Sequence, residues 1–525
     1  MIRTLVKLAL IIFIGFAFLN LDNFYAIDRF NAIGLNMQGQ LGLAEHIRQL
    51  AFIVEYILAI IILLTATQLK KVWCCSFLTL LWILVGVDLI AHLIYHRPAD
   101  INNISMLNAS IANIGDAFHQ YSDLILDVIG KTSLLFIPLF LINLLGKKRA
   151  QLSIQMFSVS MATLLFCYIF ILVSRGAPAL VGFPKGFSYA FGSAMIKLNS
   201  ELTPLKKIDT QKLATYRADN YNIQNVVVVI DESIEYSYFK KLFNANSPYV
   251  VNYGRSFSGG NCSATSNYIL RKGYWNLKSS TQIHIQQAPS LFAIAQRQGY
   301  QTTYIDNQNV LKDKTIRNYI DDDEIHHINT RISNDAPLYL RDMSSLQQTL
   351  AILTNDQKNF IFINKVGAHF PYAQTIPPEL ATSQNEDNYM ISISHNSVQY
   401  LKELINSIDD KTVVFYTSDH GQNLRAAATH CNSGNNISSN EYSVPFLVIT
   451  KNKELLDQLK IGSSTLFEKG NHLIFSESIR NILGEEIPGA ISIFKNLSFQ
   501  ADYYGMYGQP FSFFGVCPSS YKLTH

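Results

Sequence analysis

Five long apolar stretches in the first third of the chain constrain its fold more than any other feature. They cover about residues 4–21, 49–69, 72–95, 124–146 and 150–174, and the last contains no Asp, Glu, Lys or Arg. About 20 apolar residues in a helix are needed to cross the hydrocarbon core of a bilayer. The stretches therefore predict five transmembrane helices within residues 1–175, the first being an uncleaved span rather than a signal peptide.

Clusters of basic residues between these stretches predict how the spans are oriented. Lys70 and Lys71 lie between the second and third stretches, and Lys147, Lys148 and Arg149 lie between the fourth and fifth. Short loops rich in Lys and Arg remain in the cytoplasm. We therefore expect the chain after about residue 175 to be exported.

The exported part divides into a connector and a domain. Residues 176–221 carry scattered Gly, Pro and Lys, and part of this connector is expected to form an interfacial helix. Residues 222–525 are long enough to bury a globular core. The near balance of 42 Lys and Arg against 39 Asp and Glu gives no basic excess that would indicate nucleic-acid binding.

Two smaller features concern ion pairing and cysteines. Asp127 and Lys131 are spaced i and i+4 within a predicted span, which indicates an ion pair in the helix bundle, with a contact to a lipid headgroup as the alternative. Three of the six cysteines, Cys262, Cys431 and Cys517, fall in the exported half. At most one disulfide can form among these three.

Short β-branched or aromatic segments mark the strands of the exported half. They lie at 225–230, 301–305, 359–364, 412–417 and 445–449, separated by segments with helical spacing. Such alternation is typical of a largely parallel sheet covered on both faces. The predicted fold is an α-helical five-span membrane domain followed by an α/β domain whose mostly parallel sheet is sandwiched by helices.

Polar residues follow four of these strands directly. They are Asp231-Glu232-Ser233, Asp306-Asn307, Gly367-Ala368-His369 and Ser418-Asp419-His420-Gly421. Ligands of open α/β sheets bind outside the carboxyl ends of the strands. A mixed set of Asp, Glu and His suits Zn²⁺ or a similar divalent cation. Each motif alone has a simpler explanation, since Glu232 could merely begin a helix, and Asp419-His420 and His430 could lie in ordinary surface loops.

A cluster of hydroxyl residues provides candidates for a nucleophile. Gly259 and Gly260 precede Ser263, Thr265 and Ser266 at the expected start of a helix, where backbone N–H groups are exposed. The alternative is that these hydroxyls only cap the helix.

These motifs, which extend over about residues 225–450, resemble those of the alkaline phosphatase and sulfatase superfamily. With the five spans, the whole chain resembles the lipid A phosphoethanolamine transferases, which include the mobile colistin-resistance enzymes. The resemblance implies that Glu232, Asp419 and His420 bind Zn²⁺ together with the nucleophile's oxygen. It also implies that His369 and His430 contact the phosphate group or protonate a leaving group. Asn307, in the turn Tyr304-Ile305-Asp306-Asn307, would help to hold the substrate.

The sequence departs from the family pattern at several positions. Relatives carry a Thr nucleophile, whereas Ser263 is the first choice here because Ser266 follows at +3 and Gly273 at +10. Thr265 and Ser266 remain alternatives, and aligning Cys262 on the family's preceding Cys would select Ser266. Gln422 stands where relatives have Glu, which leaves a second metal site open. The family's multiple disulfides are mostly missing.

The resemblance implies transfer of phosphoethanolamine from phosphatidylethanolamine to lipid A or another envelope glycan through a phospho-Ser or phospho-Thr intermediate. Such a protein would be a monomer in the bacterial inner membrane, with its catalytic domain in the periplasm, and would modify lipopolysaccharide and confer polymyxin resistance. Two alternatives are a phosphoglycerol transferase of the lipoteichoic-acid-synthase or glucan type and a catalytically silent membrane regulator that binds lipid.

Overall fold

The computed structural model divides the chain into two compact units, residues 1–203 and 204–525. In the first unit the structure describes mainly residues 57–95, 114–145 and 151–175, together with the separate residues 12–14, 17 and 54. In the second it describes residues 214–215, 221–244, 246–273, 289–308, 320, 322–425, 429–432, 437–486, 491–494, 502–506 and 520–524. The interfacial helix predicted within the connector lies outside these residues, and the predicted limits at 175 and 221 stay predictions.

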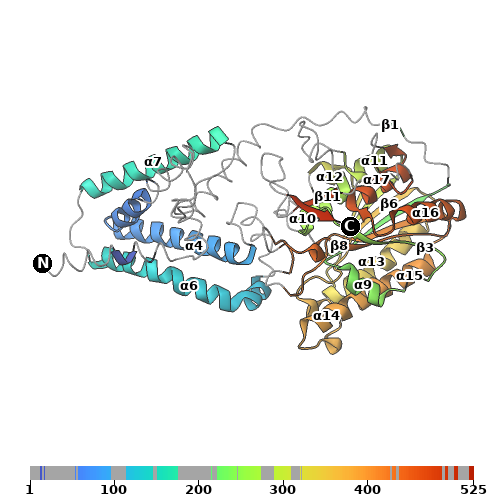
Figure 1. Cartoon of the computed structure of the whole chain (residues 1–525), viewed down its shortest axis with the longest axis horizontal. Helices are drawn as coiled ribbons and strands as arrows, with labels where there is room; N and C mark the ends of the chain where they lie inside the picture. The colour runs from blue at the N-terminus through green and yellow to red at the C-terminus, as the bar shows by residue number, and fades with distance from the viewer. Residues whose placement is uncertain are drawn as a thin grey trace. The chain divides into compact units, whose positions relative to one another are not determined.

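The first unit contains long apolar helices (Figure 1). Helix α4 (Lys71–Tyr95), helix α6 (Ile114–Leu145) and helix α7 (Gln151–Arg175) coincide with the third, fourth and fifth predicted spans. Among the described residues, Ser122–Leu144 is the one helical stretch long and apolar enough to cross a membrane. Most of the first two stretches lies outside the described residues, so the count of five crossings stays a prediction.

Polar contacts join helices of this unit. The indole Nε1 of Trp82 donates to Oγ1 of Thr132 over 2.7 Å, which links α4 to α6. The side-chain amide of Asn143 donates to the carbonyl of Thr67 over 2.6 Å. Hydrogen bonds of this kind hold helices together where apolar surroundings give little driving force for association. Within α6, Asp127 and Lys131 form the predicted ion pair at 2.6 Å.

The second unit is built on an eight-stranded sheet with the order β5-β4-β6-β2-β7-β8-β3-β9. Its strands are β2 (Asn225–Asp231), β3 (Val250–Phe257), β4 (Gln301–Asp306), β5 (Thr330–Ser333), β6 (Asn359–Asn364), β7 (Thr412–Ser418), β8 (Ser443–Thr450) and β9 (Gly470–Asn471). All five predicted strands are present. The five strands from β5 to β7 run parallel, while β8 runs antiparallel to both β7 and β3.

Helices cover both faces of this sheet, as predicted (Figure 1). The side chains of β2 alternate between the two cores, and every residue of the strand is buried. One core includes α11 (Leu291–Arg297), α16 (Lys453–Leu466) and α17 (His472–Ile482). The other includes α9 (Tyr236–Leu242), α13 (Leu338–Leu353), α14 (Asn385–Ser392), the π-helical turn Ile393–Gln399 and α15 (Tyr400–Ser407). Two further helices of this unit are α10 (Ser263–Lys272) and α12 (Asp322–His326). Two small antiparallel strand pairs are also present: β1 (Ala214–Thr215) with β10 (Glu485–Glu486), and β11 (Asp502–Met506) with β12 (Ser520–Thr524).

Candidate metal and phosphoryl-transfer site

The register of the two central strands places the first two candidate ligands side by side. Asp231 of β2 is paired with Ser418 of β7, so the next residues, Glu232 and Asp419, leave the sheet together. The backbone N–H of Asp419 donates to the carbonyl of Asp231 over 2.9 Å, and the N–H of Ser233 donates to Oδ1 of Asp419 over 3.0 Å. The ends of two parallel strands therefore place both carboxylates side by side.

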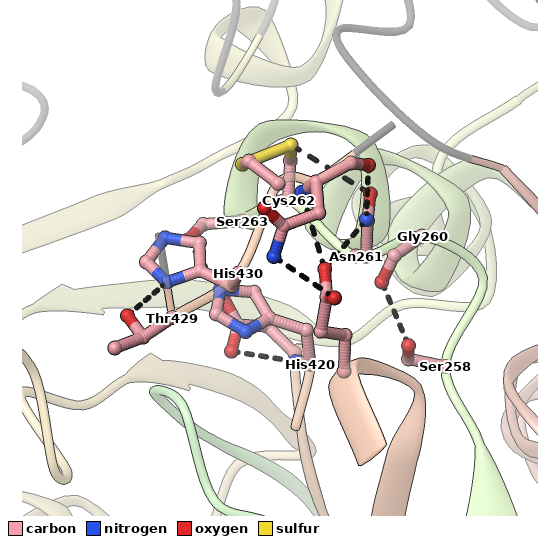
Figure 2. The surroundings of a disulfide bond; sticks show 12 residues. Ser258, Gly260, Asn261, Cys262, Ser263, His420, Thr429 and His430 are labelled. Carbon is pink, nitrogen blue, oxygen red and sulfur yellow. Dashed lines mark hydrogen bonds and ion pairs between the residues drawn. A yellow bond between two sulfur atoms is a disulfide. The ribbon is translucent and has the colours of Figure 1, made fainter. Parts of the chain in front are cut away.

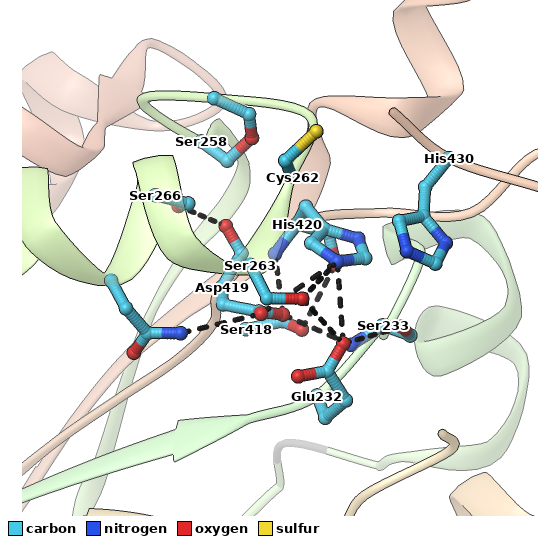
Figure 3. A network of polar contacts seen from close by, with 12 residues as sticks. Glu232, Ser233, Ser258, Cys262, Ser263, Ser266, Ser418, Asp419, His420 and His430 are labelled. Atoms are coloured by element: carbon cyan, nitrogen blue, oxygen red, sulfur yellow. Dashed lines mark hydrogen bonds and ion pairs between the residues drawn. The ribbon is translucent and has the colours of Figure 1, made fainter. Parts of the chain in front are cut away.

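Ser263 completes this cluster from a third element (Figure 3). It is the first residue of α10, and its Oγ lies 3.1 Å from Oε1 of Glu232 and 3.0 Å from Nε2 of His420. Ligand atoms of Glu232, Asp419 and His420 lie within 4.8 Å of one another, and all three residues are buried. The structure thus brings the four predicted metal ligands into one cluster.

The protonation of the cluster shows why a cation fits it. Burial raises the pKa of the Asp419 carboxyl well above its usual range, and the neighbouring Glu232 charge raises it further. Burial lowers the pKa of His420, but the carboxylates of Asp419 and Glu232 outweigh burial and raise it to about 9. The raised pKa of Asp419 favours its neutral form, and the charge of Glu232 has the His420 imidazolium as its partner. A divalent cation held by these residues would supply the positive charge instead.

The ring of His420 is oriented for such a role. Its Nδ1 lies 2.7 Å from the carbonyl oxygen of Gly421, which can only accept a hydrogen bond. Nδ1 therefore carries a hydrogen, and Nε2 faces Glu232 and Ser263. Imidazoles that bind metals commonly donate their other N–H to a carbonyl in this way.

The two alternative nucleophiles occupy different surroundings. Ser266 is fully buried, and its hydroxyl contacts the carbonyl of Asp419 and lies 3.0 Å from Nδ1 of His472. Thr265 is also fully buried, and its methyl group is close enough to Gly260 to exclude a Cβ there. Ser263 is therefore the candidate hydroxyl that the structure places beside the metal donors.

The turn after β6 brings His369 to the same side of the sheet. Gly367 has a positive φ of 53°, and a Cβ at this position would lie 2.6 Å from the backbone nitrogen of Glu232. Only glycine allows this approach. His369 is half-buried. Burial raises the pKa of Glu232, but the hydrogen bond and charge of His420, with His369 and His430 nearby, lower this pKa well below its usual range. His430 stacks its ring on His420 with 4.4 Å between centroids, and burial together with repulsion from His420 lowers its pKa to about 3.

Asn307 lies apart from the cluster. Its side-chain amide is buried and donates to Oδ1 of Asp342 over 2.7 Å and to the hydroxyl of Ser345 over 2.9 Å, both on α13. The next residue, Gln308, instead reaches the cluster, since its Nε2 donates to Oε2 of Glu232 over 2.9 Å. Sequence reasoning missed Gln308, although its position directly after a strand could have drawn attention to it.

Two further residues near the site were not assigned a role from sequence. Gln422 is buried and donates to the hydroxyl of Tyr372 over 2.7 Å. His472 is the first residue of α17, and its Nε2 lies 3.0 Å from the carbonyl oxygen of Ser418. Ser418 is the residue before Asp419. No motif surrounds His472, and the strand before it has only two residues, so the sequence carries no signal for it.

Comparison with known proteins agrees with this architecture. Residues 224–457, somewhat less than half of the chain, match the family model described as Sulfatase. The fold of the chain is similar to that of the integral membrane protein lipooligosaccharide phosphoethanolamine transferase A from Neisseria meningitidis. The TM-score is 0.59 at 15% identity, and the match covers 91% of this chain and 95% of that one.

Two curated relatives are similar over shorter segments. Kdo(2)-lipid A phosphoethanolamine 7''-transferase from Salmonella typhimurium (strain LT2) is 29% identical over 128 residues, which is 22% of this chain and 23% of the relative. The protein of the same name from Escherichia coli (strain K12) is 31% identical over 96 residues, which is 16% and 17% of the two chains. The matched segments thus span less than a quarter of these relatives.

Proposed function

We propose that this protein transfers phosphoethanolamine from phosphatidylethanolamine to lipid A or another cell-envelope glycan. The observation that carries the proposal is the position of Ser263, whose hydroxyl lies 3.0 Å from His420 and 3.1 Å from Glu232 at the start of α10. A hydroxyl beside buried metal donors and at the positive end of a helix is suited to attack a phosphoryl group. The similarity to named phosphoethanolamine transferases supports this choice of headgroup.

The donor set fits one Zn²⁺, held by Glu232, Asp419, His420 and the oxygen of Ser263. When bound, Zn²⁺ lowers the pKa of a hydroxyl and neutralises charge on phosphoryl oxygens. Oε1 of Glu232 and Nε2 of His420 both face the Ser263 hydroxyl and orient it for attack. No second cation is part of the proposal.

The reaction has two displacement steps at phosphorus. In the first, Oγ of Ser263 forms a bond to phosphorus, the bond from phosphorus to the diacylglycerol oxygen breaks, and this oxygen takes up a proton. In the second, an acceptor oxygen attacks the same phosphorus, and Ser263 leaves and regains a proton. His369 binds phosphoryl oxygens or delivers the proton to the leaving oxygen, and His430, whose pKa is low, binds phosphoryl oxygens as a neutral imidazole.

The location of the protein belongs to the same proposal. A multi-pass anchor in the bacterial inner membrane would keep the catalytic domain in the periplasm, where both lipid substrates are reached. The apolar helices α4, α6 and α7 support an anchor of this kind. Lipid A modified with phosphoethanolamine carries added positive charge, which accounts for the expected resistance to cationic polymyxins.

Intact-mass measurement of the zinc-loaded full-length protein tests the proposal. After incubation with phosphatidylethanolamine and no acceptor, wild type is expected to gain one phosphoethanolamine on Ser263, and the Ser263→Ala variant none. Lipid A added afterwards should remove the adduct and become modified. A glycerol-phosphate adduct, or an unmodified protein that binds donor without turnover, would contradict the proposal.

A further inference from the structure

A disulfide joins two segments of the candidate site that are far apart in sequence (Figure 2). Cys262 and Cys431 form this bond over a separation of 169 residues. Cys262 is the residue before Ser263, and Cys431 is the residue after His430. The bond therefore ties the backbone of the proposed nucleophile directly to that of the histidine stacked on His420.

Hydrogen bonds reinforce this connection on its inner side. The backbone N–H of Cys431 donates to the carbonyl of Asn261 over 2.8 Å, and the Asn261 amide donates to the carbonyl of Asn432 and to Glu441 over 2.8 Å each. Asn432 in turn donates to the other carboxylate oxygen of Glu441 over 3.0 Å. Asn261, Asn432 and Glu441 are almost completely buried. These three residues, together with the disulfide, are called the loop clamp below.

The backbone of Cys431 shows that the clamp imposes a conformation. Its φ is 61°, in the left-handed region that residues other than glycine rarely adopt. Such a conformation persists where surrounding bonds hold it in place. On the other side of His430, the hydroxyl of Thr429 lies 3.3 Å from Nδ1 of the ring.

The metal donors, by contrast, are held without the clamp. Glu232 and Asp419 are fixed by the paired ends of β2 and β7, and Nδ1 of His420 is fixed by the carbonyl of Gly421. Opening the disulfide would therefore loosen the His430 loop. Helix α10 would stay attached to the metal donors, because Ser266 and Asn267 donate hydrogen bonds to Asp419. Positioning of His430 and metal binding are thus separable.

We propose that Cys262 and Cys431 are positioning residues that make phosphoryl transfer depend on their oxidation, because the disulfide holds His430 against His420 beside Ser263. This inference rests on the proposed function. It adds that the site is completed only in an oxidising compartment, where disulfides persist. Metal binding does not share this dependence.

Reduction of the folded, zinc-loaded protein in detergent tests the inference. A water-soluble phosphine breaks the S–S bond to give two thiols, whose two hydrogens come from one water, and the phosphine becomes its oxide with the oxygen of that water. Opening is counted by maleimide mass shift, and zinc content is measured on the same samples. We expect kcat to fall about tenfold or more, since misplacing a reacting group by an ångström can cost this much, while one zinc is retained. Reoxidation should restore kcat.

The His430→Ala variant provides the matched background. If the disulfide acts through His430, reduction of this variant should change kcat by less than about twofold, because the group being positioned is already gone. A Cys262→Ala/Cys431→Ala double variant should show the same low kcat as reduced wild type and no response to the phosphine. Equal turnover of oxidised and reduced wild type would overturn the inference, as would loss of zinc on reduction or an equal fall in the His430→Ala background.

The oxidised wild type separates this inference from the proposed function. If oxidised, zinc-loaded wild type yields no phosphoethanolamine product, the proposed function fails and the inference fails with it. If it yields product at a rate that reduction does not change, the inference alone fails.

Discussion

A hydrogen bond between Gln308 and Glu232 gives the two carboxylate oxygens of Glu232 different partners. Nε2 of Gln308 donates to Oε2 over 2.9 Å and also to the carbonyl of Lys365 over 2.8 Å, so both hydrogens of this nitrogen are engaged. Oε1 is left to face Ser263 and His420. The turn after β4 thus orients a ligand that belongs to β2.

Replacing Gln308 by Ala should weaken zinc binding about 10–100-fold, the usual effect of removing a hydrogen-bond partner of a metal ligand. Loss of this hydrogen bond would let the carboxylate rotate away from the cluster. Competition with a chromogenic chelator measures the change. Asn307→Ala is the neighbouring control, because its amide contacts Asp342 and Ser345 instead. Equal zinc affinity of Gln308→Ala and wild type would show that Gln308 does not orient Glu232.

Ser263 and Ser266 should respond differently to substitution by Ala. Ser263→Ala is expected to remove the phosphoethanolamine adduct and leave thermal stability near that of wild type, because Ser263 is only partly buried. Ser266→Ala should keep the adduct on residue 263 but lower stability by about 1–3 kcal/mol, since the buried partners of its hydroxyl, the Asp419 carbonyl and His472, lose a contact. Peptide mapping and thermal unfolding distinguish the two. An adduct mapped to Ser266 in wild type would show that Ser266, and not Ser263, is the nucleophile.

Gly367→Ala should disturb both the fold and the metal site. An added Cβ would lie 2.6 Å from the nitrogen and 2.7 Å from the oxygen of the Glu232 backbone, and φ is also positive. We expect a loss of at least about 2 kcal/mol in stability and weaker zinc binding. Gly299→Ala is a matched control, because φ is positive there too but no atom lies within 4 Å of the added Cβ. Similar losses in the two variants would mean that strain alone, and not contact with Glu232, decides the effect.

His472 should make the second unit of the chain less stable in acid. Burial lowers the pKa of His472 to about 3, whereas the pKa of a histidine in an unfolded chain is about 6.5. Between these values the unfolded state binds more protons, so stability falls as pH decreases from about 6.5 towards 3, by up to ~1.4 kcal/mol per pH unit from this side chain. In His472→Asn this contribution disappears, and the slope of unfolding free energy against pH should be shallower. Parallel slopes for the two proteins would contradict the assignment.

The strands that the sequence predicted correctly share one property. Segments such as 225–230 are buried on both faces, so they are apolar throughout and stand out from their surroundings. Strands β5 and β9 were missed because one is mostly exposed and the other has two residues. Strand β3 contains Asn252, Gly254 and Arg255, and its pairing with β8 shifts register there, so it lacks a regular apolar pattern.

The candidate site was predictable where residues follow strands and unpredictable where loops meet. Glu232, Asp419 and His420 were found because the carboxyl ends of neighbouring parallel strands converge. The pairing of Cys262 with Cys431 could not be derived, because three cysteines leave the partner undefined. The one disulfide among the described residues is consistent with the expected limit of one, and Cys517 lies outside the described residues.

The covalent link between Cys262 and Cys431 closes the middle of the second unit into a ring. The ring contains strands β4 to β7 and both Asp419 and His420, while Glu232 lies outside it. Closing a ring of this length restricts the unfolded chain, an effect of about 5 kcal/mol in the chain-entropy model. A single proteolytic cut within the ring would leave the two fragments attached to each other. Such nicked molecules would migrate as one species until a thiol reagent separates them.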